Sequence, residues 1–311
     1  MNDWSKFNFK EYIKTDSMMY NLPKGVSIST MCAKCKIGTE LDIDLIKNHM
    51  NLSFDDILTI KINNENMRTL MEAKKKKRRT KRKAKTTNNP FYNQITVVVR
   101  INEGSYKNIH DEPKINLKLF KNGSIQISGL KNIDYANRAL NKLIYCLSQV
   151  KGKVNADNTI TDVHFVSDVN KLNITDFEIY MINSNYMVNM MIDRAKLYSL
   201  LLMKKIKASY EKCVRACVNV KYVPPTHNSE EKDVSVFIFE KGNIIITGAR
   251  NFHHVVATYD YINNILLNHI EEIIKKDDIL EGNIILKFYE DIFNEYQHQM
   301  ENHTFGEKLL A

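Results

Sequence analysis

The amino-acid sequence predicts an α+β fold in which a largely antiparallel sheet is built from two copies of one unit. Two stretches match, LFKNGSIQISGLKN at residues 119–132 and IFEKGNIIITGARN at residues 238–251, at a constant offset of 119 positions. In each, two strand-like runs flank a glycine turn, and the apolar spacing then becomes helical. Strands followed by a helix, in two copies, are typical of a sheet with helices on one face.

Glycines and apolar stripes define the matching part of each copy. Gly123 and Gly242 supply the positive φ that a tight hairpin turn needs, and Gly129 and Gly248 close the second strand. Beyond them, apolar residues at helical spacing predict one helix per copy: Ala136, Leu140, Leu143 and Leu147 in the first, and Val255, Tyr259, Ile262 and Leu266 in the second.

Similar elements precede the hairpin in both copies. The first copy has strand-like runs at 26–31 and 56–63 around a helical stretch at 44–49, and the second has 177–183 and 206–211 around 193–203. At the offset of 119, residues 95–101 align with residues 214–220 without a gap. We therefore expect strand, helix, four strands and a long helix in each repeat, with one sheet face left uncovered.

Composition sets the remaining organisation. We expect an N-terminal extension (1–24), a first repeat (25–150), a second repeat (165–275) and an acidic helical tail (276–311). Five cysteines without a regular framework indicate a reducing compartment, and the short apolar runs predict no membrane association. The Cys32/Cys35 pair cannot fill the four positions of a structural zinc site, so we expect no metal and no cofactor. No arrangement typical of a catalytic site is present, and we expect no enzymatic activity.

The positive charge is concentrated in one short run. The chain has a formal net charge of +9 and this run carries ten positive charges, so the remainder carries 9 − 10 = −1. The run lies in the loop between the second and third strands of the first copy, and could contact phosphates, act as a nuclear-localisation signal or be a solvated tract. Its members are Lys74, Lys75, Lys76, Lys77, Arg78, Arg79, Lys81, Arg82, Lys83 and Lys85.

The shared string F-x-x-G-x-x-x-x-[ST]-G-x-[KR], together with the order of elements, resembles the TATA-box-binding protein family over roughly residues 25–270. This resemblance implies a saddle whose concave ten-stranded sheet lies on the DNA minor groove while four helices cover the convex side. It also implies a kink produced by apolar side chains that unstack base steps. We therefore expect a monomer that binds double-stranded, AT-rich promoter DNA and recruits transcription factors and RNA polymerase.

Carried over position by position, the resemblance assigns DNA contacts in both repeats. Phe120 and Phe239 match the intercalating phenylalanine, Ser128 and Thr247 match a hydroxyl that faces the groove, and Lys131 and Arg250 match a basic residue near phosphates. Arg100 matches an arginine of the central strand, with Asn219 as its expected counterpart. Phe237 and Asn183 complete the expected DNA-binding set, and Tyr210 and Glu211 are expected to contact partner proteins.

The sequence also departs from the family pattern. Gln94 and Cys213 stand where a second phenylalanine wedge is expected, and Val26 and Met181 stand where an asparagine reads the groove centre. Asn183, two residues after Met181 and thus on the same strand face, is expected to replace one of them in part. Because the minor-groove code is degenerate, we expect a relaxed A·T preference.

Abundant lysine, asparagine and isoleucine are typical of an AT-rich genome, and together with the divergence they favour a large DNA virus as the source. The expected location is then a viral factory in the host cytoplasm or the virion, with the nucleus as the alternative. Two other functions remain open: a protein–protein adaptor that keeps the saddle, and a non-specific nucleic-acid binder acting through residues 74–85.

Overall fold

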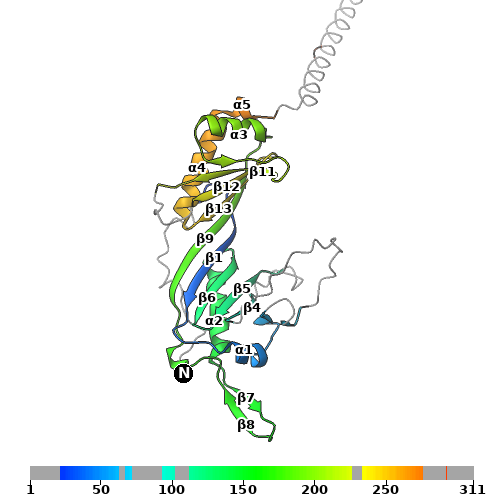
Figure 1. Ribbon diagram of the computed structural model, residues 1–311, viewed down its shortest axis with the longest axis vertical. Helices are drawn as coiled ribbons and strands as arrows, with labels where there is room; N and C mark the ends of the chain where they lie inside the picture. Colours follow the sequence, from blue (N-terminus) through cyan, green and yellow to red (C-terminus); the bar gives the residue numbers. More distant parts are fainter. Residues whose placement is uncertain are drawn as a thin grey trace, which may run out of the picture.

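The computed structural model describes residues 22–62, 67–71, 93–101, 112–225, 233–275 and 292. They form one 11-stranded antiparallel sheet with helices packed on one face, and a separate two-stranded hairpin. Figure 1 shows the sheet as a long curved layer with one repeat at each end. The fold is an α+β saddle of two pseudo-symmetric repeats, which confirms the predicted fold class.

The two repeats have nearly the same order of elements. The first contains β1 (Ser27–Lys36), α1 (Ile43–His49), β2 (Ile57–Lys61), β3 (Met67–Thr69), β4 (Gln94–Arg100), β5 (Lys114–Phe120), β6 (Ser124–Leu130) and α2 (Ile133–Ser148). The second contains β9 (Thr175–Met187), α3 (Arg194–Met203), β10 (Ala208–Ser209), β11 (Cys217–Tyr222), β12 (Val234–Phe239), β13 (Asn243–Ala249), α4 (Phe252–Asn268) and α5 (Ile270–Ile273). Between the repeats lie the hairpin β7 (Lys151–Val154) and β8 (Ile160–Val163) and a 3-10 turn, Val169–Lys171.

The two half-sheets join through β1 and β9. The strand order is β10-β11-β12-β13-β9-β1-β6-β5-β4-β2-β3, so these two strands stand at the centre. Cys35 pairs with Ile125 as Tyr186 pairs with Ile244, which makes Cys35 and Tyr186 equivalent, 151 positions apart. Met31 and Ile182 are equivalent by the same offset, and they pair with each other. The pseudo-twofold axis of the saddle therefore passes between these two residues.

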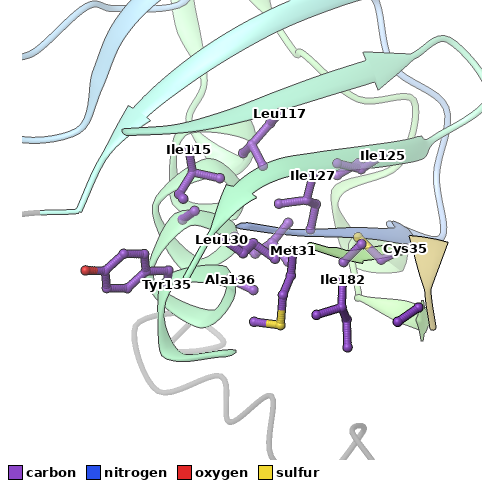
Figure 2. Packing of buried hydrophobic residues seen from close by; sticks show 14 of the residues in the cluster. Met31, Cys35, Ile115, Leu117, Ile125, Ile127, Leu130, Tyr135, Ala136 and Ile182 are labelled. Atoms are coloured by element: carbon purple, nitrogen blue, oxygen red, sulfur yellow. The ribbon is translucent and has the colours of Figure 1, made fainter. Parts of the chain in front are cut away.

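The core lies between the sheet and its helices. Strand residues at alternate positions point to the helix face, because successive side chains of a strand point to opposite sides. Figure 2 shows Ile115, Leu117, Ile125 and Ile127 from β5 and β6 on the same side as Ala136 of α2, and all five are fully buried. Each large aliphatic side chain buried in this way contributes about 1.5–3 kcal/mol to stability.

Both repeats begin their long helix with the same cap. The side-chain oxygen of Asn132 accepts a hydrogen bond from the Tyr135 amide at 2.9 Å, and that of Asn251 accepts one from the His254 amide at 2.8 Å. An asparagine at this position satisfies one of the amides that a helix start leaves unpaired. The second half of the shared sequence string therefore encodes the entry into α2 and α4.

The structure differs from the sequence predictions in three elements. The sheet has eleven strands in place of ten because β3 pairs with the edge strand β2. The hairpin β7–β8, near the first-repeat end in Figure 1, was not predicted. The predicted strand at 206–211 is reduced to the two residues of β10. No helix in the described ranges is long and apolar enough to cross a membrane.

The gap-free alignment of residues 95–101 with residues 214–220 is wrong. Asn116 and Ser235 are equivalent at the offset of 119, but their strand partners Val98 and Lys221 are 123 positions apart. Between equivalent positions, the chain from β11 to β12 is therefore four residues shorter than that from β4 to β5. A short, strongly apolar strand matches equally well in two registers by sequence, and only the pairing partners distinguish them.

Replacing Gly242 by alanine is expected to lower the free energy of unfolding by about 2–4 kcal/mol. Gly242 has a φ of +78°, and an added Cβ would lie 2.1 Å from the Val188 carbonyl oxygen. The control is Gly25→Ala, because Gly25 also has a positive φ but its Cβ would meet nothing within 4 Å, and we expect a loss of about 1 kcal/mol there. Equal losses in urea unfolding would contradict the close approach.

Replacing Ser184 by alanine is expected to raise stability by about 1 kcal/mol. Ser184 is fully buried and its hydroxyl has no hydrogen-bond partner among the described residues, while Ala33 occupies the equivalent position in the first repeat. Thr258→Ala is the control, since the buried Thr258 hydroxyl donates to the His254 carbonyl at 2.6 Å and its removal should destabilise. Thermal unfolding measures both, and a destabilised Ser184→Ala would refute the assignment.

Candidate nucleic-acid interface

The strands present their other side chains to a face that no described helix covers, which we call the open face. On β5 the buried positions Ile115, Leu117 and Leu119 alternate with partly or fully exposed ones that end at Phe120. The same alternation on β12 ends at Phe239. Phe120 and Phe239 therefore both lie on the open face, at the last position of their strands.

The two phenylalanines occupy equivalent places on either side of the saddle centre. Phe120 pairs with Gln94 of β4, and Phe239 pairs with Cys217 of β11. Each lines a hollow in the surface, of about 570 Å³ beside Phe120 and about 610 Å³ beside Phe239. Both side chains are therefore partly exposed on the open face, each beside a hollow.

Hydroxyl and amide groups lie nearer the centre of the open face. Ser128 pairs with Cys32, and Thr247 pairs with Asn183, to whose side-chain oxygen the threonine hydroxyl donates a hydrogen bond. Among polar side chains that the sequence analysis missed, Asn185 accepts hydrogen bonds from the hydroxyls of Ser27 at 2.7 Å and Ser29 at 2.9 Å. The sequence signal for Asn185 is its position two residues after Asn183, on the same strand face.

Comparison with known proteins identifies the family. The chain is 33% identical over 280 residues to a TATA-box-binding protein-like protein of Acanthamoeba polyphaga mimivirus, covering 85% of this chain and 70% of the relative. The chain belongs to the TATA-box-binding protein-like family. A solved structure of Methanococcus jannaschii TBP also matches, with a TM-score of 0.46 and 15% identity, covering 78% of this chain and 98% of that one. No protein-family profile matches.

The register changes which residues stand at the positions that depart from the family pattern. The counterpart of Gln94 is Cys217 and not Cys213, because both pair with the phenylalanine at the end of the next strand. In the first strands, the 151-residue offset makes Phe177 the counterpart of Val26, whereas Met181 corresponds to Thr30. The assignments of Cys213, Val26 and Met181 were carried over from the resemblance by matching short stretches of sequence, and such matching does not determine the register of a strand.

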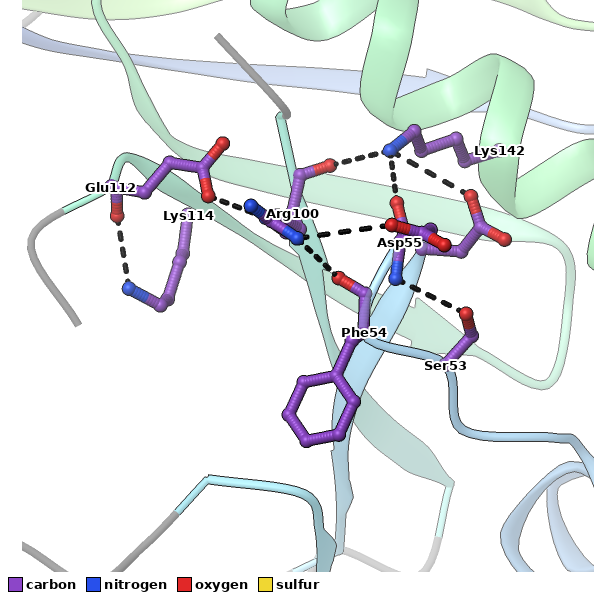
Figure 3. Close-up of polar contacts among 8 residues, drawn as sticks. Ser53, Phe54, Asp55, Arg100, Glu112, Lys114 and Lys142 are labelled. Carbon is purple, nitrogen blue, oxygen red and sulfur yellow. Dashed lines mark hydrogen bonds and ion pairs between the residues drawn. The ribbon is translucent and has the colours of Figure 1, made fainter. Parts of the chain in front are cut away.

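Arg100 lies in a network within the protein at the end of β4 (Figure 3). Its Nε donates to the buried Glu112 carboxylate, and its Nη1 donates to the Phe54 carbonyl at 3.0 Å and lies 3.8 Å from Asp55. By the corrected register its counterpart is Val223, while Asn219 corresponds to Thr96. Arg100 therefore joins the β4–β5 connection to the segment before β2, and a DNA contact by this residue stays a prediction.

Lys142 of α2 extends the same network. Its Nζ donates to the carbonyls of Asp55 at 2.5 Å and Arg100 at 3.0 Å and lies 3.6 Å from the Asp56 carboxylate. Burial lowers the pKa of the Lys142 ammonium from its ordinary value, and Asp56 acts in the opposite direction. The helix is thus tied to the strand end through two backbone carbonyls.

The remaining predicted contacts lie in different surroundings. Lys131 is exposed and Arg250 partly buried, each one residue before the cap of its helix. Phe237 lies on the open face of β12, two residues before Phe239. Tyr210 packs edge-on against Tyr198 of α3, with its ring 5.7 Å from the Arg194 guanidinium, and Glu211 is exposed beside it.

Several predictions fall outside the described residues or concern metals. The basic run at 74–85 lies within the undescribed residues 72–92, and the tail from 276 onward is described only at residue 292.

Cys32 and Cys35 lie on opposite faces of β1, and burial raises the pKa of the Cys35 thiol to about 12. Within the described ranges, no cluster of three or more histidine, cysteine or acidic side chains has a geometry that could hold a metal ion.

Replacing Arg100 by methionine is expected to cost about 2–3 kcal/mol of stability. The change leaves the Glu112 carboxylate, whose side chain is 2% exposed, without the guanidinium that faces it. Lys131→Met, at an exposed position of the same repeat, removes the same kind of charge and should cost almost nothing. Urea unfolding of both variants makes the comparison, and similar losses would show that the network contributes little.

Proposed function

We propose that this protein is a transcription initiation factor that binds AT-rich promoter DNA in the minor groove through its open face and recruits transcription factors and RNA polymerase through its helix-bearing face. The observation that carries the proposal is the placement of Phe120 and Phe239 at equivalent strand ends on the open face. The relative from mimivirus, which is named for TATA-box binding, supports it.

The chemistry of the open face suits the minor groove. Apolar wedges unstack base steps at a cost of a few kcal/mol, which additional contacts with the bent DNA offset. A·T pairs present only acceptors in this groove, so the Ser128 hydroxyl and the NH2 group of Asn183, whose oxygen accepts from the Thr247 hydroxyl, are compatible with them. Asn183 places an amide beside Thr247 in the second repeat, whereas its counterpart beside Ser128 in the first repeat is Cys32. The presence of this amide in only one repeat favours a relaxed A·T preference.

The setting we propose is viral transcription. The compositional bias toward AT-rich codons and the viral relative both favour it. The protein would then act in a cytoplasmic viral factory or travel in the virion, with the nucleus as the alternative. The run at 74–85 would add phosphate contacts beside the groove, and Tyr210 and Glu211 would lie on the surface that faces partner proteins.

A protein–protein adaptor is the second candidate, and one observation favours it. The open face of the first repeat carries the ion pairs Lys34–Glu178 and Lys36–Asp176, each at 2.9 Å. Carboxylates repel the acceptors of the groove floor, while ion pairs are common at the rim of protein interfaces. The adaptor predicts no binding to AT-rich or GC-rich duplexes at any salt concentration.

Replacing Phe120 and Phe239 together by alanine is expected to weaken binding to an AT-rich duplex at least tenfold and to reduce DNA bending, because the wedges are removed. Tyr145→Ala is the matched control, since this exposed aromatic lies on α2, away from the open face. Fluorescence anisotropy gives affinity and energy transfer between duplex ends gives bending. Unchanged affinity and bending in the double variant would refute the proposal.

Deleting residues 74–85 is expected to flatten the dependence of affinity on salt while keeping the preference for AT-rich over GC-rich DNA. Each phosphate contact that is lost lowers the slope of log affinity against log salt by about 0.9. Titrations at two salt concentrations measure both properties. A deletion that abolishes binding to both duplexes equally would instead identify a non-specific binder that acts through this run.

A further inference from the structure

Matched rows of side chains cross the open face of the two repeats with different chemistry. In the first repeat, one row runs through Thr96, Lys118, Gln126, Lys34 and Glu178, from β4 to β9. The equivalent row in the second repeat runs through Asn219, Phe237, Ile245, Asn185 and Ser27, from β11 to β1. Each row stands two residues from its phenylalanine, Phe120 or Phe239, on the same face.

The first row is charged and the second is neutral. Lys34 forms an ion pair with Glu178 at 2.9 Å, and at the equivalent place Asn185 accepts a hydrogen bond from Ser27 at 2.7 Å. The next position outward repeats the contrast, because Lys36 is paired with Asp176, whereas its counterpart Met187 is 66% exposed and apolar. Lys118 likewise corresponds to Phe237.

This contrast changes the cost of inserting the neighbouring phenylalanine into DNA. A wedge enters only where the surface around it is brought into dry contact with bases and sugars. In the row beside Phe239 such contact covers a phenylalanine, an isoleucine and a neutral amide, which lose little on desolvation, and the Arg194–Glu240 ion pair lines the same hollow outside this row. Beside Phe120 it would remove water from paired lysine and carboxylate groups, and desolvation of an ion pair often costs more than the pairing returns.

We infer that the two ends of the saddle act differently: Phe239 is the wedge that kinks the DNA, Phe120 stays at the DNA surface beside lysines that meet the backbone, and the duplex is bound in one direction. The inference rests on the proposed function and adds the residues that set direction. The second repeat, with Phe237, Ile245 and Asn185 beside its wedge, covers the A·T-rich end, because that end is read through groove acceptors.

The test uses a duplex with one A·T half and one G·C half, carrying 2-aminopurine at the outer step of either half. Direction is read by an iron chelate attached to Cys213, which is exposed in the connection from β10 to β11, in a Cys146→Ala background. We expect strand cleavage in the A·T half only, and a rise in 2-aminopurine fluorescence at the A·T end only.

Single variants then separate the two wedges. Phe239→Ala should remove at least four-fifths of the fluorescence rise, whereas Phe120→Ala should leave it within about a fifth of the unchanged protein, as should the control Tyr145→Ala. A triple variant, Lys118→Phe with Lys34→Asn and Glu178→Ser, gives the first repeat the row of the second. We expect it to cleave both halves and to unstack both ends.

The outcomes distinguish this inference from the proposed function. Cleavage of both halves by the unaltered protein, or equal fluorescence losses in Phe120→Ala and Phe239→Ala, would overturn the one-ended kink while DNA binding stands. Unchanged one-sided cleavage by the triple variant would overturn the role of the rows. Failure of the unaltered protein to bind any duplex would overturn the proposed function and this inference with it.

Discussion

The antiparallel pairing of β1 with β9 is the contact on which the rest of the saddle depends. Each half-sheet has its own helices, but only this pairing makes the two halves one continuous surface. Because Met31 pairs with its own equivalent, Ile182, every open-face position of one repeat has a partner position at the same distance from the centre in the other. A one-residue slip here would place the helix face of one half-sheet on the same side as the open face of the other.

Within this frame the helix face and the open face have followed different constraints. On the helix face both repeats bury aliphatic residues at equivalent positions, for example Ile127 and Ile246, because the core must be filled at nearly constant volume. On the open face equivalent positions differ in charge, size and polarity, as Lys118 and Phe237 do. Where packing does not fix the residue type, the two halves are able to take on different tasks.

Arg100 has a structural role at a position where the family resemblance predicts a DNA contact. Its guanidinium joins the segment before β2 to the buried Glu112 carboxylate, and Lys142 adds α2 to the same cluster. Two cations share these few carbonyl and carboxylate oxygens at one corner of the sheet. The corresponding corner of the second repeat has Val223, so the two ends of the saddle are also held together differently.

The sequence alone determined the duplication, the hairpin and helix of each repeat, and the α+β class, because glycine turns and apolar spacing are local signals. It also placed Phe120 and Phe239 in a shared string. Only the tertiary structure decided which residues of β4 and β11 are equivalent, and in which register β1 pairs with β9. The reason is that strand pairing joins residues far apart in the chain. For the same reason only the structure brought Lys34 to Glu178 and Ser27 to Asn185, and so showed that the halves of the open face differ in charge.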